Sequence, residues 1–517
     1  MSSSIDKAYD LYVIGGGING VGIAVDAAGR GLKVGLCEKS DLAGATSSAS
    51  SKLIHGGLRY LEHYEFRLVK EALAERETLL KLAPHIAKPL RFCLPHRPQL
   101  RPAWMIRIGL FLYDNLSRRT TLAGCTGVKF SENSPLKPTF KKGFEYSDAW
   151  VDDARLVVLN AMKLQALGGT VQTRTEVTRA WREGNLWHVK LKDHFNNTEQ
   201  VIKTKGLVNA AGPWVKSVME GTLNRPSPHG ISLVKGSHII VPKIHNEPKA
   251  YILQNEDQRI VFVLPYQDDF SIIGTTDVKH TADPGEVSCS GEETEYLCKV
   301  VNQHFTKQIS PSDVIRTYSG VRPLCDDESD SPQSITRDYT MEIEDQDGQT
   351  PLLAVFGGKL TTYRKLGEAA VNKLAKYYPE ASGQWTANTQ LPGAEGMTSA
   401  QECAAELTRK YPWLNPEQAR RFSTSYGSLA YKFLEHCQSE ADMGKHFGGG
   451  LTQTEVDYLM ADEWAYTTED VLWRRSKLGL RVDELGHRKL QDYMEQQLPS
   501  VLKHRFQASD MTLNKAV

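Results

Sequence analysis

The sequence predicts an α/β protein in which a Rossmann-like nucleotide-binding domain carries an inserted antiparallel sheet and is followed by a C-terminal helical domain. Three patterns predict this: a glycine-rich turn after the first strand, short β-rich segments between residues 225 and 345, and helical spacing after about residue 395. A chain of 517 residues is also long for one hydrophobic core. We expect a nucleotide-binding domain at 1–392, with the sheet inserted at about 65–150 and 225–345, and a helical domain at 393–517.

The first element is a short apolar strand that ends in a Gly-x-Gly-x-x-Gly fingerprint. Gly15 allows the tight turn, Gly17 lets the backbone approach a pyrophosphate, and Gly20 lets the following helix at 21–28 pack against the strand. The free N–H groups at the start of that helix, together with its dipole, favour a negatively charged group. The pattern predicts a bound dinucleotide, and the alternative is a glycine-rich turn in an unrelated α/β protein.

The second strand, at 33–37, ends at Glu38, whose carboxylate can accept both ribose hydroxyls of an adenosine. A hydroxyl-rich loop follows, in which Ser47, Ser48 and Ser51 can donate to a diphosphate and to a flavin edge. The fingerprint alone does not separate NAD from FAD. Its position near the N-terminus and this loop favour FAD, and the alternative for the loop is a solvated serine cluster.

The middle of the chain alternates between helical and strand patterns. Apolar residues at helical spacing predict a helix at 65–82. An apolar strand ends in small residues at 206–212, where Ala210 and Gly212 are candidates for contact with the cofactor. Segments typical of an antiparallel sheet follow at 238–241, 259–264 and 270–274.

A last apolar strand at 351–356 leads through two glycines into a helix at 363–377. Backbone N–H groups at that helix start would stabilise an anionic reduced flavin, which makes Leu360 and Thr361 cofactor candidates. The alternative is a plain helix cap supplied by a threonine. The boundary to the C-terminal helices is expected at 392–393.

Composition and charge exclude several classes of protein. Lys+Arg and Asp+Glu are both 62, so no global charge favours a nucleic acid partner. The eight cysteines show no metal-site spacing, so we expect reduced thiols in a cytoplasmic protein and no metal. No apolar leader precedes the first strand, and no run of about eighteen apolar residues would span a bilayer.

One segment suits a membrane surface. Residues 104–113 are strongly apolar, and arginines lie within and around them, Arg101 and Arg107 among them. An apolar helix flanked by arginines can lie in the headgroup region of an anionic membrane. The alternative is a buried helix whose arginines reach out from its ends.

Together, these motifs resemble the FAD-dependent glycerol-3-phosphate dehydrogenases, in particular the bacterial aerobic, respiratory enzymes. The segments that carry the resemblance are 10–20, 45–62, 144–155, 208–214, 235–238, 319–326 and 356–364. The likeness covers almost the whole chain and weakens toward the C-terminus. It implies an FAD-binding fold of the D-amino-acid-oxidase type.

The resemblance also implies a reaction and partners. It implies that bound FAD oxidises sn-glycerol 3-phosphate to dihydroxyacetone phosphate and that the electrons pass to a membrane quinone, either ubiquinone or menaquinone. The enzyme would bind peripherally to the cytoplasmic face of the inner membrane. The choice of quinone, its binding site and a homodimeric state stay open.

Such a substrate, a small dianion with a secondary alcohol, needs cations. Arginine forks recognise phosphate through paired hydrogen bonds, and cations at turns and strand ends can reach a cofactor. We assign Arg59 and Tyr60 to the substrate pocket and Arg337 to further phosphate support. Arg322 and Lys359 are expected nearer the carbinol, where they would stabilise a developing alkoxide. The alternative for each cation is a surface charge.

His238 opens a strand after Gly236-Ser237, and its near-neutral pKa suits it to accept the hydroxyl proton. The alternative is a structural histidine. Two rival functions stay open: an oxygen-using FAD oxidase of glycerol 3-phosphate or a small amine, and a flavin-holding sensor or scaffold without turnover.

Overall fold

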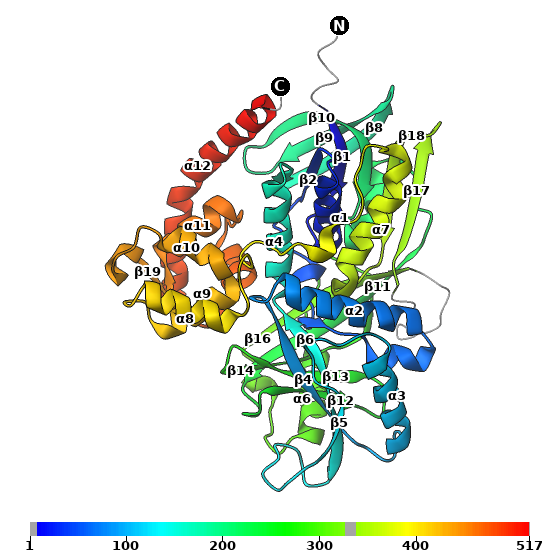
Figure 1. The fold of residues 1–517 in the computed structure, drawn as a ribbon, viewed down its shortest axis with the longest axis vertical. Helices are drawn as coiled ribbons and strands as arrows, with labels where there is room; N and C mark the ends of the chain where they lie inside the picture. The colour runs from blue at the N-terminus through cyan, green and yellow to red at the C-terminus, as the bar shows by residue number, and fades with distance from the viewer. Residues whose placement is uncertain (1–7, 326–337, 516–517) are drawn as a thin grey trace.

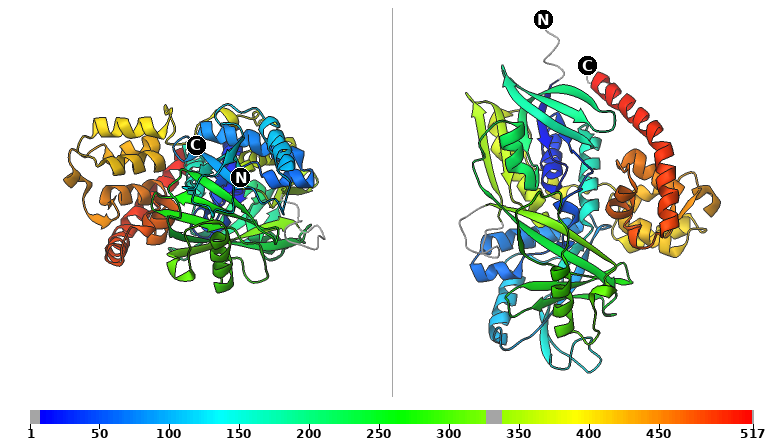
Figure 2. Two further views of the ribbon diagram at one scale, coloured as in Figure 1. Left: turned by 90° about the horizontal axis from the view of Figure 1, so that it is seen from below. Right: turned by 180° about the vertical axis from the view of Figure 1, so that it is seen from behind.

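The computed structural model describes residues 8–325 and 338–515, apart from the side chains of Arg59, Glu62, His63 and 506–515. Two sheets lie one above the other in Figure 1, and the C-terminal helices form a lobe beside them, as both views in Figure 2 show. The predicted fold class is confirmed, because the fingerprint begins the first sheet, a second sheet is inserted into the chain, and helices dominate the C-terminal part.

The first sheet contains the glycine fingerprint. Its strand order is β17-β18-β10-β1-β2-β7, with β8 and β9 extending it from β10. The neighbours from β18 to β7 pair in parallel. Leu11–Ile14 of β1 are buried because helices α1, α4 and α7 pack on one face of the sheet, and apolar side chains of β8 and β9 pack on the other. Its strands are β1 (Tyr9–Ile14), β2 (Val34–Cys37), β7 (Thr170–Gln172), β8 (Thr175–Glu183), β9 (Leu186–Asp193), β10 (Thr198–Asn209), β17 (Thr340–Gln346) and β18 (Gln349–Phe356).

Helix α1 packs against both α4 and α7 in Figure 1. A Cβ at Gly22 of α1 would lie 2.9 Å from the ring of Tyr363, so this glycine allows α1 and α7 to approach closely. The helices outside the C-terminal lobe are α1 (Ile18–Gly29), α2 (Phe66–Leu82), α3 (Ala103–Asn115), α4 (Asp153–Ala166), α5 (Val215–Ser217), α6 (Gly291–His304) and α7 (Tyr363–Leu374).

The second sheet takes its strands from two stretches of chain, 53–151 and 231–325. Its order is β15-β11-β14-β13-β12-β4-β6-β3, with β16 beside β11 and β5 beside β6. The pairs are antiparallel as predicted, except that β12 and β4 pair in parallel where the two stretches meet. Its strands are β3 (Leu53–Ile54), β4 (Ala87–Pro95), β5 (Thr126–Lys129), β6 (Lys142–Val151), β11 (Ile231–Pro242), β12 (Lys249–Gln254), β13 (Ile260–Tyr266), β14 (Phe270–Gly274), β15 (Val278–His280) and β16 (Arg316–Cys325).

The expected end of the inserted sheet, near residue 345, differs from the structure. Strand β17 pairs with β18 in the first sheet, so the last described strand of the second sheet is β16, which reaches Cys325. The reason is local, because β17 and β18 are joined by a short turn at 347–348 and form a hairpin.

The C-terminal helices enclose a hydrophobic core that includes Leu407, Phe422, Leu459 and Leu490. A small hairpin of β19 and β20, too short for a sequence pattern to predict, lies among them. The domain boundary at 392–393 stays a prediction. The elements are α8 (Ala400–Lys410), α9 (Pro416–Ser425), α10 (Ala430–Leu434), β19 (His446–Gly448), β20 (Leu451–Thr452), α11 (Gln453–Asp462) and α12 (Glu484–Lys515).

Candidate active site

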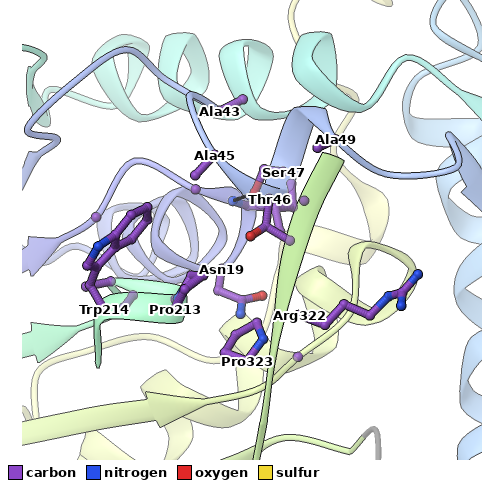
Figure 3. Close-up of a pocket in the computed structure, with 18 of the residues that line it drawn as sticks. Asn19, Ala43, Ala45, Thr46, Ser47, Ala49, Pro213, Trp214, Arg322 and Pro323 are labelled. Atoms are coloured by element: carbon purple, nitrogen blue, oxygen red, sulfur yellow. Dashed lines mark hydrogen bonds between the residues drawn. The ribbon is translucent and has the colours of Figure 1, made fainter. Parts of the chain in front are cut away.

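A cavity of about 720 Å³ lies where the two sheets meet, which is the size range of small-molecule and cofactor sites. Its walls come from the fingerprint, the loop at 43–51, the turn at 210–214, the second sheet and residues 357–361. Trp214 and Arg322 lie at opposite sides of the group of lining residues in Figure 3, so the cavity is long.

The glycines of the fingerprint have different roles at this cavity. Gly15 has a φ of +112°, and a Cβ on Gly20 would lie 1.9 Å from the Gly15 carbonyl oxygen, so both positions require glycine for the fold itself. Gly17 has a φ of −81°, and a Cβ there would contact only the Ser47 Oγ, at 3.2 Å. Gly15 and Gly17 line the cavity, whereas Gly20 packs behind the turn.

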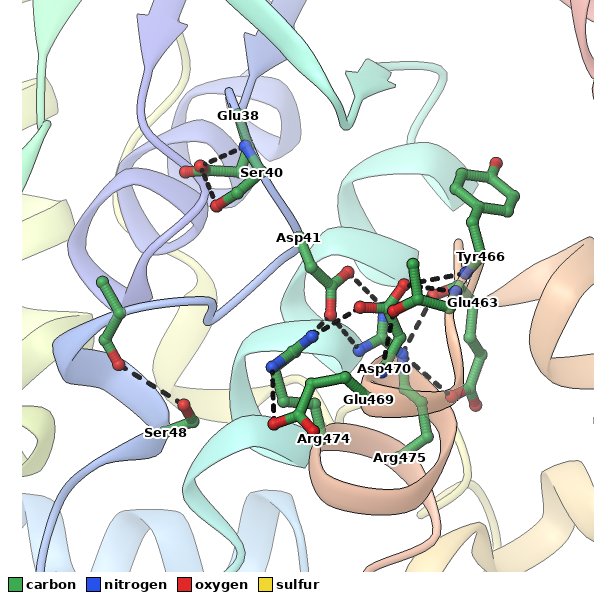
Figure 4. Close-up of polar contacts among 12 residues, drawn as sticks. Glu38, Ser40, Asp41, Ser48, Glu463, Tyr466, Glu469, Asp470, Arg474 and Arg475 are labelled. Atoms are coloured by element: carbon green, nitrogen blue, oxygen red, sulfur yellow. Dashed lines mark hydrogen bonds and ion pairs between the residues drawn. The ribbon is translucent and has the colours of Figure 1, made fainter. Parts of the chain in front are cut away.

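Glu38 and Trp214 line the cavity on the side of the first sheet. The Glu38 Oε2 accepts a hydrogen bond from the Gly16 backbone N–H at 2.7 Å. Its Oε1 accepts from the Ser40 backbone N–H at 2.8 Å and the Ser40 hydroxyl at 2.9 Å, as Figure 4 shows. The Lys39 Nζ lies 4.1 Å from the centre of the Trp214 ring. These hydrogen bonds fix the Glu38 carboxylate at the end of β2, against the Gly16 N–H of the fingerprint.

The three predicted serines face two sides of one loop. The Ser47 Oγ accepts from the Ile18 backbone N–H at 3.0 Å, which ties the loop to the start of α1. The Ser51 Oγ lies 2.8 Å from the His238 Nε2. Ser47 and Ser51 line the long cavity, whereas Ser48 lines a separate cavity of about 280 Å³ behind the loop.

His238 is buried and lines the long cavity. It does not open a strand as expected, because β11 begins at Ile231 and the pairing of β11 with β16 continues on both sides of His238. Its ring stacks on Tyr318, with ring centres 4.7 Å apart, and Gly274 leaves room for it, because a Cβ there would lie 2.2 Å from the imidazole. Burial, and then the charges of Arg322 and Lys52, lower the pKa of His238 well below its usual range. The imidazole is therefore neutral at neutral pH, with one unprotonated ring nitrogen, but the lowered pKa makes it a weaker base than a free histidine.

The cations expected near the carbinol also line the cavity. The guanidinium of Arg322 donates from Nη1 to Asp277 at 2.5 Å and from Nη2 to the Thr275 Oγ1 at 3.0 Å. Gly236 makes space for it, because a Cβ there would lie 2.6 Å from the Nη2. The Lys359 Nζ lies 4.0 Å from the centre of the Tyr60 ring.

Four of the remaining predicted residues line the cavity, and the side chains of two others lie outside the part of the chain that the structure describes. Ala210, Gly212, Leu360 and Thr361 line it, and the Thr361 Oγ1 accepts from the His55 backbone N–H at 3.3 Å. The side chain of Arg59 and the whole of Arg337 lie outside the described residues.

Some lining residues escaped the sequence reasoning. The Asn19 Nδ2 donates to the Gly357 carbonyl oxygen at 3.0 Å, which joins the fingerprint to the turn after β18. Phe262 and His55 form an edge-to-face pair, with ring centres 6.4 Å apart, on another wall. Asn19 lies inside the fingerprint and could have been singled out there. Its contact with a residue 338 positions away has no signal in the sequence.

Comparison with known proteins assigns the family. Residues 10–364 match the family model described as FAD dependent oxidoreductase, and 384–497 match the C-terminal domain of alpha-glycerophosphate oxidase. The aerobic glycerol-3-phosphate dehydrogenase of Escherichia coli K12 is 58% identical over 471 residues, which cover 91% of this chain and 94% of that protein. The chain belongs to the family of FAD-dependent glycerol-3-phosphate dehydrogenases.

Two further relatives show how far the family extends. The D-erythritol 1-phosphate dehydrogenase of Brucella abortus (strain 2308) is 47% identical, covering 92% of this chain and 95% of that protein. The crystal structure of the Bacillus halodurans glycerol-3-phosphate dehydrogenase with FAD has a TM-score of 0.73 and 26% identity, and covers 100% of this chain and 96% of that one. The family and its fold are thus confirmed, and the protein is an FAD-dependent oxidoreductase.

The residues of the cavity fit FAD. Gly17 exposes backbone at the start of α1, where N–H groups favour a pyrophosphate, and Glu38 lies at the end of β2, where it can accept ribose hydroxyls. Two buried atoms of lining residues, the Asn19 Oδ1 and the His238 Nδ1, have no hydrogen-bond partner among the described residues. Such atoms call for a polar ligand.

Proposed function

We propose that the protein oxidises sn-glycerol 3-phosphate to dihydroxyacetone phosphate and passes the electrons to a membrane quinone. One observation supports the reaction most directly. The buried, neutral His238 lies in the same cavity as two cations, Arg322 and Lys359, and the fingerprint glycines that would bind FAD. The name of the Escherichia coli relative supports the substrate.

In this proposal the chain's residues bind the dianion and move one proton. Arg59, Tyr60 and Arg337 bind the phosphate, and Arg322 and Lys359 stabilise negative charge on the C2 oxygen. The C2 hydroxyl proton reaches the His238 Nε2, either directly or through the Ser51 hydroxyl, which lies 2.8 Å from it. When bound, FAD supplies the acceptor for the hydride that leaves C2. Substrate loses a hydride and a proton, and dihydroxyacetone phosphate forms.

Helix α3 supports a membrane acceptor. Among its apolar residues, Trp104, Ile108 and Phe111 are 62%, 53% and 66% exposed, while Ile106 and Leu110 are buried against the protein. This exposed face fits an interfacial helix better than the alternative of a buried one. No described helix is long and apolar enough to cross a membrane. We propose peripheral binding at the cytoplasmic face of the inner membrane, where quinone is available.

An anaerobic titration tests the reaction. Adding sn-glycerol 3-phosphate to the purified yellow protein should bleach the flavin absorbance, and a soluble quinone should restore it. Absorbance that stays constant would remove glycerol 3-phosphate as the substrate. Rapid formation of hydrogen peroxide in air, at a rate matching turnover, would instead establish the oxygen-using oxidase.

The Brucella abortus relative makes D-erythritol 1-phosphate a second candidate substrate. The two compounds share a phosphate and a secondary alcohol, and erythritol 1-phosphate has one more carbon. The flavin reduction rate divided by the half-saturating concentration, measured for each, decides between them. We expect the larger value for sn-glycerol 3-phosphate.

A further inference from the structure

The loop after β2 is held from behind by the C-terminal helices. The carboxylate of Asp41, only 2% exposed, accepts from the Arg475 Nη1 and Nη2 at 2.9 and 2.8 Å and from the Arg474 Nε at 2.6 Å. Figure 4 shows both guanidinium groups pointing at Asp41. The residues that meet here are more than 430 positions apart in the chain.

The arginines are themselves fixed within the C-terminal segment. Arg475 is fully buried and donates from Nε and Nη2 to the Glu463 carbonyl oxygen at 3.0 and 2.7 Å. Asp470 accepts from the Arg474 Nη2 at 2.5 Å and from the Arg174 Nη2 at 2.6 Å. The guanidinium groups are therefore oriented before they meet Asp41, which favours a directional contact.

The same C-terminal segment also reaches the other end of the loop. The Asp153 carboxylate accepts from the Ser50 Oγ at 2.7 Å and from the Lys52 Nζ at 2.8 Å. The Lys477 Nζ lies 3.7 Å from that carboxylate and 3.2 Å from Asp152. Arg474 and Arg475 thus contact the loop directly at Asp41, whereas Lys477 lies beside the Asp153 carboxylate that binds the other end at Ser50 and Lys52.

Between these ends, the loop separates two cavities. Ala45, Thr46 and Ala49 line the long cavity on one side and the 280 Å³ cavity on the other, and Arg474 and Lys477 line the latter. Two contacts also hold the middle of the loop: the Thr46 hydroxyl donates to the Val321 carbonyl oxygen at 2.7 Å, and the Ser47 Oγ accepts from the Ile18 N–H at 3.0 Å. The contact at Asp41 adds to these from the C-terminal side. The loop is also joined to residues that line the FAD site. Asp41 is three residues from Glu38, and the Ala43 N–H donates to the carbonyl oxygen of Gly16 in the fingerprint at 3.1 Å.

We propose that Asp41 and Arg475 are positioning residues for FAD: through this ion pair the C-terminal helices hold the loop at 38–52 against the bound cofactor. The C-terminal lobe then acts as a clamp for the cofactor, although none of its described residues lines the long cavity. By thermodynamic linkage, bound FAD must also stabilise residues 463–477.

The first test measures FAD release. Asp41→Asn weakens the contact with Arg475, and we expect FAD to dissociate at least tenfold faster from the purified full chain, followed by the rise of flavin fluorescence on dilution. The matched control is Arg421→Gln, which breaks the ion pair (2.5 Å) of the half-buried Arg421 with the buried Glu455 in the C-terminal lobe without touching the loop. Release within twofold of the wild-type rate in Asp41→Asn, or an equal acceleration in Arg421→Gln, would overturn the proposal.

The second test uses only the wild-type protein, so it does not depend on whether a variant folds. Hydrogen exchange of the wild-type chain is compared with FAD bound and after FAD removal. We expect backbone amides in 463–477 to exchange at least tenfold more slowly with FAD, while amides of α8, remote from the loop, change little. Equal exchange in 463–477 in both states would show that the lobe does not sense the cofactor, and the proposal would fail.

Discussion

At the residue scale, neighbouring glycines of the fingerprint are required for different reasons. Gly15 and Gly20 are fixed by backbone contacts within the protein, whereas Gly17 faces the long cavity with only Ser47 nearby. A side chain at Gly17 would therefore leave the fold intact and occupy the approach to the pyrophosphate. This difference separates a folding defect from a binding defect.

Gly17→Val should purify folded and colourless, because its branched side chain points into the space that the pyrophosphate requires. The bound flavin per chain, measured by absorbance, should fall below a tenth of the wild-type value, with the circular dichroism spectrum unchanged. Gly291→Val at the start of α6, where a Cβ meets nothing within 4 Å, is the control and should stay yellow. Full flavin content in Gly17→Val would refute the placement.

Arg322→Met should slow substrate-driven flavin reduction by a factor on the order of 100, because an oriented cation near the reacting oxygen stabilises the transition state by a similar amount in other enzymes. Stopped-flow absorbance measures this rate, and bound FAD should be retained. A rate within threefold of the wild type would remove Arg322 from the reaction.

At the scale of elements, helix α3 has one apolar face that is exposed among the described residues. The exposed side chains of Trp104, Ile108 and Phe111 are grouped on it, and Tyr64 and Phe66 near the start of α2 are exposed as well. Large apolar groups gathered on one surface mark an interaction site.

Trp104→Ser combined with Phe111→Ser should weaken binding to anionic lipid vesicles at least tenfold, since each buried aromatic side chain contributes roughly 1.5–3 kcal/mol. Vesicle sedimentation measures the binding. Leu485→Ser, which removes an equally exposed apolar residue from α12, is the control and should bind as the wild type does. Unchanged binding of the double variant would leave α3 without a role at the membrane.

The elements that carry a strong local pattern could be predicted. The spacing of apolar residues and glycines at 10–38 predicted β1, α1 and β2, which the structure has at Tyr9–Ile14, Ile18–Gly29 and Val34–Cys37. The parallel β12–β4 pair could not be predicted, because pairing between distant strands leaves no local periodicity.

The candidate site was predictable to the same extent. His238, Arg322 and Lys359 were singled out from short motifs and do line one cavity, but their roles stay predictions. What holds them was not visible: Gly274 and Tyr318 around His238 come from other strands. The sequence does not encode these neighbours at any fixed spacing, so only the folded chain shows them.

At the scale of the whole molecule, buried neutral histidines contribute to the loss of stability in acid. Burial lowers the pKa of His85 to about 3, and that of His245 and His304 to about 4. In the unfolded chain each has a pKa of about 6.5, so below that pH the unfolded state binds protons that the folded state does not. Stability therefore falls as the pH drops from about 6.5 toward 4.

Near pH 5, each of these histidines lowers the free energy of unfolding by about 1.4 kcal/mol for each pH unit of acidification, and the three together lower it by about 4 kcal/mol. Asp26 acts in the opposite direction, because burial raises its pKa to about 6 although Arg30 lies 2.6 Å away. Protonation of the folded Asp26 raises the free energy of unfolding by about 1.4 kcal/mol per pH unit of acidification near pH 5. Urea midpoints at pH 7 and 5.5, with excess FAD, should show the net loss. His85→Leu should make the loss smaller, and an unchanged pH dependence would exclude His85 as a source.

The Asp41–Arg475 pair also has a consequence for synthesis on the ribosome. Strand β1 and the fingerprint emerge first, yet the long cavity needs residues 357–361, and the loop beside it meets an arginine 434 positions later. Pairing over such sequence separations is slow and comes late in folding. The FAD site of a nascent chain must therefore stay incomplete for most of its translation. A chain truncated before residue 475 would leave the ribosome without the contact between Asp41 and Arg475.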